Sequence, residues 1–265
     1  MTARTTAQRP GTPVWRDFWT ADQEGTRQFL AATFSKEVEP GLIDLTIPEG
    51  DPDMGGYTTA RIDDRHVFGI GPALPGHGDL AVVQLATDDV DATHAKALEL
   101  GATELIAPAD VPFNGRFSTV ADPIGAVVAF FRPGEMLGYA AVDELGFPCW
   151  QDLLTTDVAV AERFYGELFG FTFNHDMPGY SVAQFGEDGI FGIGPLPEGE
   201  SLWVQYQLVP RLEPVLEAAR AAGGGQVGEV MELGFGRSAH LTTPGGAAFG
   251  IFEGSEEMRA QMEQG

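Results

Sequence analysis

The chain is short of cysteine, of long hydrophobic runs and of basic residues. Its single cysteine, Cys149, excludes an intramolecular disulfide and a thiolate zinc cluster. Its longest apolar run, Ile124–Phe131, is far shorter than the roughly 20 residues of a membrane helix. The opening residues, MTARTTAQRP, lack the apolar segment of a secretion signal. These absences predict a soluble cytoplasmic protein without a membrane partner.

The scarcity of basic residues leaves a large negative charge. Fifteen Lys and Arg stand against 39 Asp and Glu, for a net charge of −24 and a pI near 4.3. Such a field repels phosphate backbones, so we expect no nucleic-acid partner. It favours a neutral or cationic small molecule. The acids are spread along the chain, and solubility alone also accounts for them.

Two similar halves are visible in the sequence. Residues 11–38 align without gaps to residues 146–173, at an offset of 135. The segment FGIGP also occurs in both halves, and GRFSTVADPIGAVVAFFRPGE loosely resembles GRSAHLTTPGGAAFGIFEGSE. We therefore predict a tandem duplication with domains at 11–133 and 146–253. The residues that the first alignment pairs include Gly11 with Gly146, Pro13 with Pro148, Trp15 with Trp150, and Asp17 with Asp152.

Each half divides again into two modules of strand and helix pattern. Asp22, Asp89 and Asp157 stand between a strand pattern and a helical one, where N-cap residues are found. One helix for every four strands argues against a doubly wound parallel sheet. The pattern predicts an α+β fold of four βαβββ modules, paired into curved, cup-like mixed sheets. Their approximate ranges are 13–72, 78–132, 147–196 and 201–252.

The opening strand reads PxWxDxxTxD in both halves, and a closing strand follows DPIGA. With four βαβββ modules, these motifs resemble the vicinal oxygen chelate superfamily of glyoxalase I, extradiol dioxygenases, fosfomycin-resistance enzymes and bleomycin-binding proteins. The resemblance covers about residues 11–253 and is greatest to two-domain glyoxalase-like proteins. It implies cups in which His, Gln or Glu on opening and closing strands chelate a divalent ion. It does not imply one activity, because the fold hosts several chemistries and some binders.

The positions that match those ligands carry no donor side chains here. A slip of one residue offers only Gln151 and Gln205, and the five histidines are scattered over different modules. We therefore expect no metal site of the family type and no cofactor. The matching positions are Trp15, Val82, Trp150 and Val204 on opening strands, and Gly69, Ala129, Gly192 and Gly250 on closing strands.

Indoles and a few polar groups replace the ligands on the face that forms the cup. Residues two apart on a strand share a face, which places Trp15, Asp17 and Trp19 together. Indole walls with sparse polar groups suit a flat organic ligand. A buried Asp17 or Asp152 has the environment of a general acid or base. The predicted ligand-binding residues are Trp15, Trp19, Gln84, Arg116, Trp150, Tyr206 and Arg237, and the predicted catalytic residues are Asp17 and Asp152.

Structural explanations compete with each of these roles. The tryptophans also suit core residues that plug an empty cup, and each aspartate also suits a partner of Arg116 or Arg237. His240 alternates with the face of Arg237, so we expect it to be packed or on the surface.

Three functions remain open. The first is metal-independent binding or sequestration of a small aromatic or cationic organic compound. The second is a metal-independent lyase, isomerase or hydroxylase-like enzyme acting on a secondary metabolite. The third is a structural or oligomerisation module. The expected partner is a small molecule, and a homodimer stays open.

Overall fold

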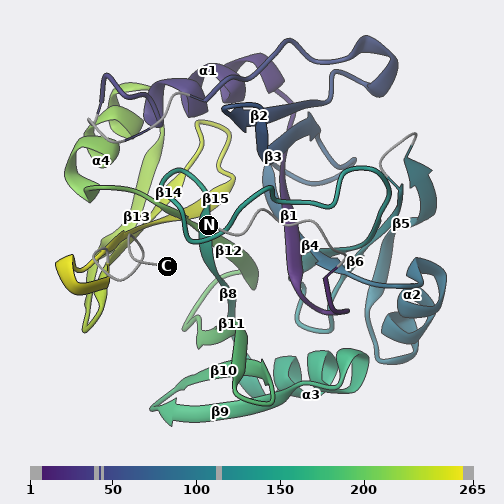
Figure 1. The fold of residues 1–265 in the computed structure, drawn as a ribbon. Helices are drawn as coiled ribbons and strands as arrows, with labels where there is room; N and C mark the ends of the chain where they lie inside the picture. The colour runs from purple at the N-terminus through teal and green to yellow at the C-terminus, as the bar shows by residue number, and fades with distance from the viewer. Residues whose placement is uncertain (1–7, 39–41, 43–44, 112–114, 259–265) are drawn as a thin grey trace.

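Two large mixed sheets form the body of the protein (Figure 1). The computed structural model describes residues 8–38, 42, 45–111 and 115–258. The first half contributes β1 (Pro13–Thr20), α1 (Gln23–Thr33), a 3-10 turn (Pro52–Met54), β2 (Thr58–Ile62), β3 (Arg65–Pro72), β4 (Leu80–Ala86), α2 (Val90–Glu99), β5 (Thr103–Val111), β6 (Gly115–Ala121) and β7 (Val127–Pro133). The second half contributes β8 (Pro148–Thr155), α3 (Val158–Phe169), β9 (Thr172–Met177), β10 (Tyr180–Phe185), β11 (Asp188–Pro195), β12 (Leu202–Leu208), α4 (Leu212–Ala221), β13 (Gly225–Leu233), β14 (Gly236–Thr242) and β15 (Ala248–Gly254).

The strand order shows how the modules pair. The first sheet runs β2-β3-β1-β4-β7-β6-β5, and the second runs β13-β14-β15-β12-β8-β11-β10-β9. In each sheet the two opening strands lie side by side and antiparallel, β1 against β4 and β8 against β12. Each opening strand also pairs in parallel with the closing strand of its module. The predicted α+β architecture of paired βαβββ modules is confirmed.

The first module departs from the predicted pattern. After α1 its described residues form only two regular strands, β2 and β3. Isolated bridges, Thr46 to Arg61 and Asp51 to Tyr57, stand where we expected a further strand. Residues 45–57, directly before β2, therefore form no regular strand, and Thr46 joins them to the edge of the sheet.

Aspartates start three of the helices, as the sequence indicates. The carboxylates of Asp22, Asp89 and Asp157 accept hydrogen bonds from backbone N–H groups of the first helical turn, at 2.8 to 3.0 Å. Such N-caps satisfy donors that have no partner inside the helix. Each of these three helices therefore begins directly after an opening strand.

The helices of one sheet pack against the helices of the other. One apolar core joins Phe29 of α1 and Val215 of α4 to the inner faces of both sheets. A second core joins Phe164 of α3 and Trp203 of β12 to β4, β6 and β7. In Figure 1, α1 lies beside α4 and α3 lies near α2. Each sheet therefore turns one face toward the shared cores; we call the opposite face the cup face.

A buried arginine connects the two sheets. Arg16 of β1 donates from Nη2 to Gln207 Oε1 at 3.1 Å and from Nη1 to the Gln205 carbonyl oxygen at 3.4 Å. Its guanidinium also lies 4.5 Å from the ring centre of Phe18 and 5.9 Å from that of Phe249 in the other sheet. Burial lowers the pKa of Arg16 to about 10, so the group stays charged at neutral pH. Because side chains alternate along β1, this contact leaves Trp15 and Asp17 on the cup face.

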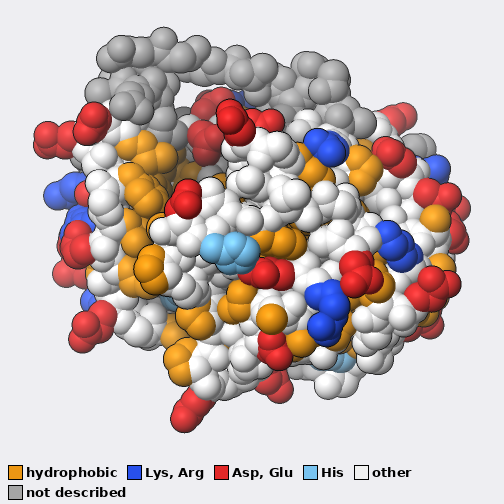
Figure 2. All heavy atoms as spheres, turned by 90° about the horizontal axis from the view of Figure 1, so that it is seen from below, with side chains coloured by type: hydrophobic (Ala, Val, Ile, Leu, Met, Phe, Trp, Pro, Cys, Tyr) orange, Lys and Arg blue, Asp and Glu red, His pale blue; other side chains and the backbone are white. Residues whose placement is uncertain are grey.

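The surface is acidic and interrupted by apolar side chains. Asp and Glu side chains are scattered over the face in Figure 2, among fewer Lys and Arg. Within the described residues, no helix combines the length and the apolar character needed to cross a membrane.

Candidate functional site

A hydrogen-bonded carboxylate occupies the centre of the first cup face. Asp17 Oδ1 accepts from Trp15 Nε1 at 2.9 Å and from the Tyr57 hydroxyl at 2.9 Å. Asp17 Oδ2 accepts from Gln84 Nε2 at 2.6 Å. Donors from two strands and one loop thus converge on the carboxylate of Asp17, a residue that is only 4% exposed. Burial of a carboxylate is tolerable when donors satisfy it in this way.

The second domain repeats the arrangement. Asp152 Oδ1 accepts from Trp150 Nε1 at 2.9 Å and from the Tyr180 hydroxyl at 2.6 Å. Tyr206 takes the place that Gln84 has in the first domain, since it pairs with Trp150 as Gln84 pairs with Trp15. It lies beside Asp152 and opposes the effect of burial on the pKa of that carboxyl. The Tyr206 hydroxyl also lies 2.7 Å from His240 Nε2. We call the two groups the Asp17 cluster (Trp15, Asp17, Tyr57, Gln84) and the Asp152 cluster (Trp150, Asp152, Tyr180, Tyr206).

Glycines on the closing strands make room for these clusters. Gly69 pairs with Asp17 across β3 and β1, and Gly192 pairs with Asp152 across β11 and β8. A Cβ on Gly69 would overlap Asp17 Oδ1 and the Tyr57 hydroxyl. A Cβ on Gly192 would overlap Asp152 Oδ1 and the Tyr180 hydroxyl. The first glycine of each FGIG segment therefore leaves the space in which the tyrosine hydroxyl and the aspartate carboxylate meet.

Burial sets the ionisation of the clusters. It raises the pKa of Asp17 to about 6, against the opposing effect of hydrogen bonds from Tyr57, Trp15 and Gln84. Burial likewise raises the pKa of Asp152. Burial and the charge of Asp17 raise the pKa of Tyr57 well above its usual value, so the phenol keeps its proton. At neutral pH the phenol therefore donates to a largely ionised carboxylate.

The residues present do not fit the divalent ion that the family resemblance implies. Such sites need several imidazole, carboxylate or amide donors that converge on one ion. In the described part of the chain, no three His, Cys, Asp or Glu side chains lie close enough to hold a metal. Each cup has one buried carboxylate. Both oxygens of Asp17 already accept hydrogen bonds from indole, phenol or amide groups, and Asp152 Oδ1 accepts from an indole and a phenol.

The tryptophans of the first cup are buried instead of lining an open surface. Trp15 is 1% exposed and Trp19 is 7% exposed. The ring of Tyr139, from the segment between the two halves, packs 5.6 Å from the ring of Trp15. Trp19 packs with Val82 and Ala129 in a small apolar cluster. In the second cup, Trp150 is only half-buried.

Two arginines lie outside the cups, contrary to our expectation. Arg116 makes ion pairs with Asp91 of α2 at 2.7 Å and with Asp110 of β5 at 3.0 Å. Arg237 makes ion pairs with Glu213 of α4 and Glu253 of β15. Carboxylates at the helix starts therefore hold both arginines on the helix side of the sheets. Neither arginine contacts Asp17 or Asp152.

His240 lies on the cup face of the second sheet. Alternation along β14 does place it opposite Arg237, as predicted. Since Arg237 faces α4, however, His240 faces the Asp152 cluster and contacts Tyr206. Burial lowers the pKa of His240, so its imidazole is neutral at neutral pH.

Sequence reasoning missed the two tyrosines. Tyr57 and Tyr180 are 123 residues apart, the same offset that separates the two FGIG segments. GYTTARIDDRHVFGIG and GYSVAQFGEDGIFGIG align without a gap at that offset. The signal was thus present, and extending the FGIG repeat toward the N-terminus would have found it.

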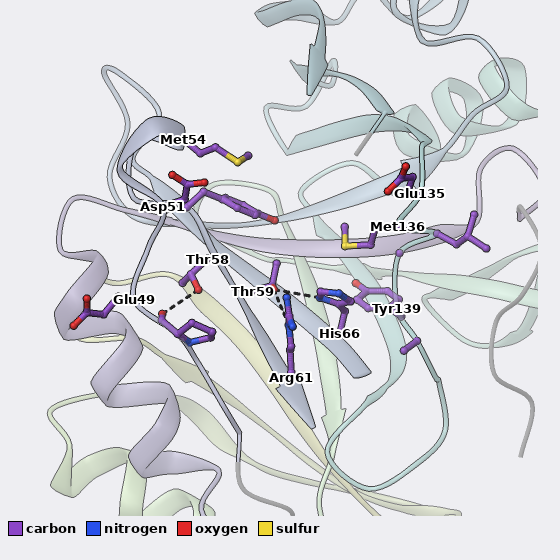
Figure 3. A pocket seen from close by; sticks show the side chains of 15 residues that line it. Glu49, Asp51, Met54, Thr58, Thr59, Arg61, His66, Glu135, Met136 and Tyr139 are labelled. Carbon is purple, nitrogen blue, oxygen red and sulfur yellow. Dashed lines mark hydrogen bonds between the residues drawn. The ribbon is translucent and has the colours of Figure 1, made fainter. Parts of the chain in front are cut away.

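A pocket of about 690 Å³ opens beside the Asp17 cluster. Tyr57 and Tyr139 contribute rings to its wall, and Met54 and Met136 contribute flexible apolar side chains. Figure 3 shows Thr59, Arg61 and His66 side by side in the pocket. Glu49 and Asp51 lie to one side of them and Glu135 lies to the other. The pocket is therefore part aromatic and part polar, and its outer parts are acidic.

Comparisons with known proteins give the class of this fold. The Mn(II)-bound glyoxalase from Novosphingobium aromaticivorans superposes with a TM-score of 0.63 at 15% identity, over 92% of this chain and 82% of that one. The 2,3-dioxygenase LapB from Pseudomonas sp. KL28 superposes with a TM-score of 0.58 at 14% identity, over 96% of this chain and 94% of that one. At these identities the likeness shows the fold alone.

Sequence similarity shows the family. The sequence model of the Glyoxalase/Bleomycin resistance protein/Dioxygenase superfamily matches residues 14–130. CFP32 of Mycobacterium tuberculosis, whose name assigns it provisionally to the glyoxylases, is 30% identical over 92% of this chain and 95% of its own length. The anthracycline biosynthesis protein DauV of Streptomyces sp. (strain C5) is 28% identical over 92% of this chain and 94% of its own. The chain belongs to the Glyoxalase/Bleomycin resistance protein/Dioxygenase superfamily.

Substitution of Gly69 by alanine tests the packing of the Asp17 cluster. Because the new Cβ would overlap Asp17 and Tyr57, we expect Gly69→Ala to lower the free energy of unfolding by about 3 kcal/mol. Gly71→Ala is the control, since its Cβ would lie 3.1 Å from the nearest atom, Tyr57 Cδ2. Urea unfolding measures both losses. Equal losses in the two variants would contradict the proposed role of Gly69.

The raised pKa of Asp17 predicts a pH dependence of stability. The folded protein holds the Asp17 proton more tightly than the unfolded chain does, so ionisation costs the folded state free energy as pH rises from about 4 to 6. Relative to Asp17→Asn, the wild-type free energy of unfolding should therefore fall by roughly 3 kcal/mol across this range. Urea unfolding at a series of pH values tests this. If the wild-type free energy of unfolding instead rose with pH relative to that of Asp17→Asn, the pKa of Asp17 would be depressed in the folded protein.

Proposed function

We propose that the protein binds a small aromatic compound with a cationic group, without a metal ion, in the pocket beside the Asp17 cluster. The pocket itself carries the proposal, because its volume of about 690 Å³ lies in the range of small-molecule sites. The wall is formed by Tyr57, Tyr139 and methionines instead of the exposed indoles that we expected.

The wall has the properties of an aromatic-binding surface. The Tyr57 hydroxyl is tied to Asp17 at 2.9 Å, which fixes the ring that lines the pocket. Met54 and Met136 supply polarizable side chains that adapt to flat rings. A fixed ring opposite adaptable side chains favours a planar ligand.

The charges around the pocket favour a cationic group on that ligand. Glu49, Asp51 and Glu135 line its outer parts. The chain as a whole carries a net charge of −24, which raises the local concentration of cations. The relatives DauV and DnrV are named as anthracycline biosynthesis proteins, which supports a secondary metabolite as the ligand.

An enzymatic function is the second candidate, and it rests on the second domain. The partly exposed His240 hydrogen-bonds the Tyr206 hydroxyl, and Tyr206 lies beside the buried carboxylate of Asp152. Such an arrangement could move a proton to or from a substrate. Turnover of a bound compound that is lost in Asp152→Asn, with binding retained, would favour this function over simple binding.

Fluorescence titration tests the binding proposal. We expect 2-naphthylmethylammonium to bind in the presence of EDTA and to change tryptophan emission, because the Tyr139 ring at the pocket packs against Trp15. Tyr57→Phe releases the wall ring and should weaken binding by roughly two- to tenfold. Tyr180→Phe removes the equivalent hydroxyl bond in the second domain and should leave binding unchanged.

The neutral analogue 2-naphthylmethanol separates the aromatic contribution from the charge. Glu135→Gln should weaken binding of the ammonium probe by about two- to fivefold and leave the alcohol unaffected. Glu187→Gln, an exposed charge on the turn between β10 and β11, is the control. Failure of both probes to bind the wild-type protein would overturn the proposal.

A further inference from the structure

The two halves differ at one wall of the pocket. The gapless alignment of their GY…FGIG segments keeps Tyr57 as Tyr180 and Gly69 as Gly192. It replaces three polar residues of the first half, so that Thr59, Arg61 and His66 correspond to Val182, Gln184 and Gly189. All three lie together in the first-domain pocket (Figure 3). The residues of the cluster are thus duplicated, whereas these three residues of the pocket wall occur in the first half only.

Arg61 has no acidic partner among the described residues, although the chain has many more acids than bases. Arg65, Arg116 and Arg237 all pair with carboxylates at 3.0 Å or less. By contrast, the side chain of Arg61 makes one long hydrogen bond, from Nε to Thr59 Oγ1 at 3.5 Å. Its remaining donors are therefore available to a ligand in the pocket.

His66 hydrogen-bonds the same hydroxyl as Arg61. Arginine can only donate, so Thr59 Oγ1 accepts from Arg61 Nε. His66 Nδ1 lies 3.2 Å from Thr59 Oγ1, and the tautomer of the ring decides which of the two atoms donates. Burial and the charge of Arg61 lower the pKa of His66, which keeps the ring neutral. Arg61 is therefore the charged group of this wall, and it can only donate.

We propose that Thr59, Arg61 and His66 form a recognition site for an oxyanion of the ligand, a carboxylate or an ionised phenol or enol on an aromatic ring. Arg61 supplies the charged donors, the neutral imidazole of His66 lies beside them, and Thr59 is a positioning residue that hydrogen-bonds both. This inference rests on the proposed binding function and specifies its ligand. With acids in the outer parts of the pocket, it describes a ligand with an oxyanion at one end and an ammonium group at the other.

The experiment compares 2-naphthoate, 2-naphthylmethanol and 2-naphthylmethylammonium on the wild-type protein and three variants by fluorescence titration. In Arg61→Gln, which has the second-domain residue, 2-naphthoate should bind at least about tenfold more weakly because charged hydrogen bonds are lost. The ammonium probe should bind equally well or more tightly. Arg220→Gln removes the same charge from α4, away from the pocket, and should change neither affinity.

Thr59→Val tests the positioning role with a residue of nearly the same shape. It should lower the preference for 2-naphthoate over 2-naphthylmethanol and leave the affinity for the alcohol unchanged. Absence of 2-naphthoate binding to the wild-type protein, or unchanged affinity in Arg61→Gln, would overturn the oxyanion site. Binding of 2-naphthylmethylammonium would still support the proposed function in either case, so the two failures are distinguishable.

Discussion

The structure of each cup depends on satisfying one carboxylate that has been removed from water. An isolated buried carboxylate is strongly unfavourable, and only converging donors make it tolerable. Trp15, Tyr57 and Gln84 supply those donors around Asp17. This requirement explains why tyrosine must reach across the sheet and why Gly69, which leaves space for the contact, stands on the closing strand. It also explains the indole at the position where the family resemblance implies a metal ligand.

The duplication separates what the fold needs from what a ligand needs. Both halves retain tryptophan, aspartate, tyrosine and glycine in the same contacts, which identifies these residues as the support of the cup. The halves differ in the groups around that support. The first has a pocket with an arginine and a histidine in its wall, whereas the second has His240 hydrogen-bonded to Tyr206 beside Asp152. We therefore infer that the halves have diverged toward different tasks on one scaffold.

Much of this architecture could be predicted from the sequence because repeats and helix caps are local signals. The offset of 135 between the two halves identified β1 and β8, the first opening strand of each half. Asp22, Asp89 and Asp157 marked where three helices start. The faces of β6 and β14 could not be predicted in this way, because alternation gives relative and not absolute orientation. The structure shows the orientation of both strands, because carboxylates of α2 and α4 bind Arg116 and Arg237 on the helix side of the sheets. The pocket was not predicted either, because residues of β2, of β3 and of the segment between the halves line it together.

The central claim is that a hydrogen-bonded carboxylate takes the place of a metal chelate in each cup. Its most direct test is the unfolding midpoint of the purified protein in EDTA and in saturating Mn²⁺, Ni²⁺ or Zn²⁺. An ion that binds only the folded state would raise that midpoint according to its affinity. We predict the same midpoint in EDTA and in each metal. A rise that saturates at one ion per domain, and that disappears in Asp17→Asn together with Asp152→Asn, would contradict the claim.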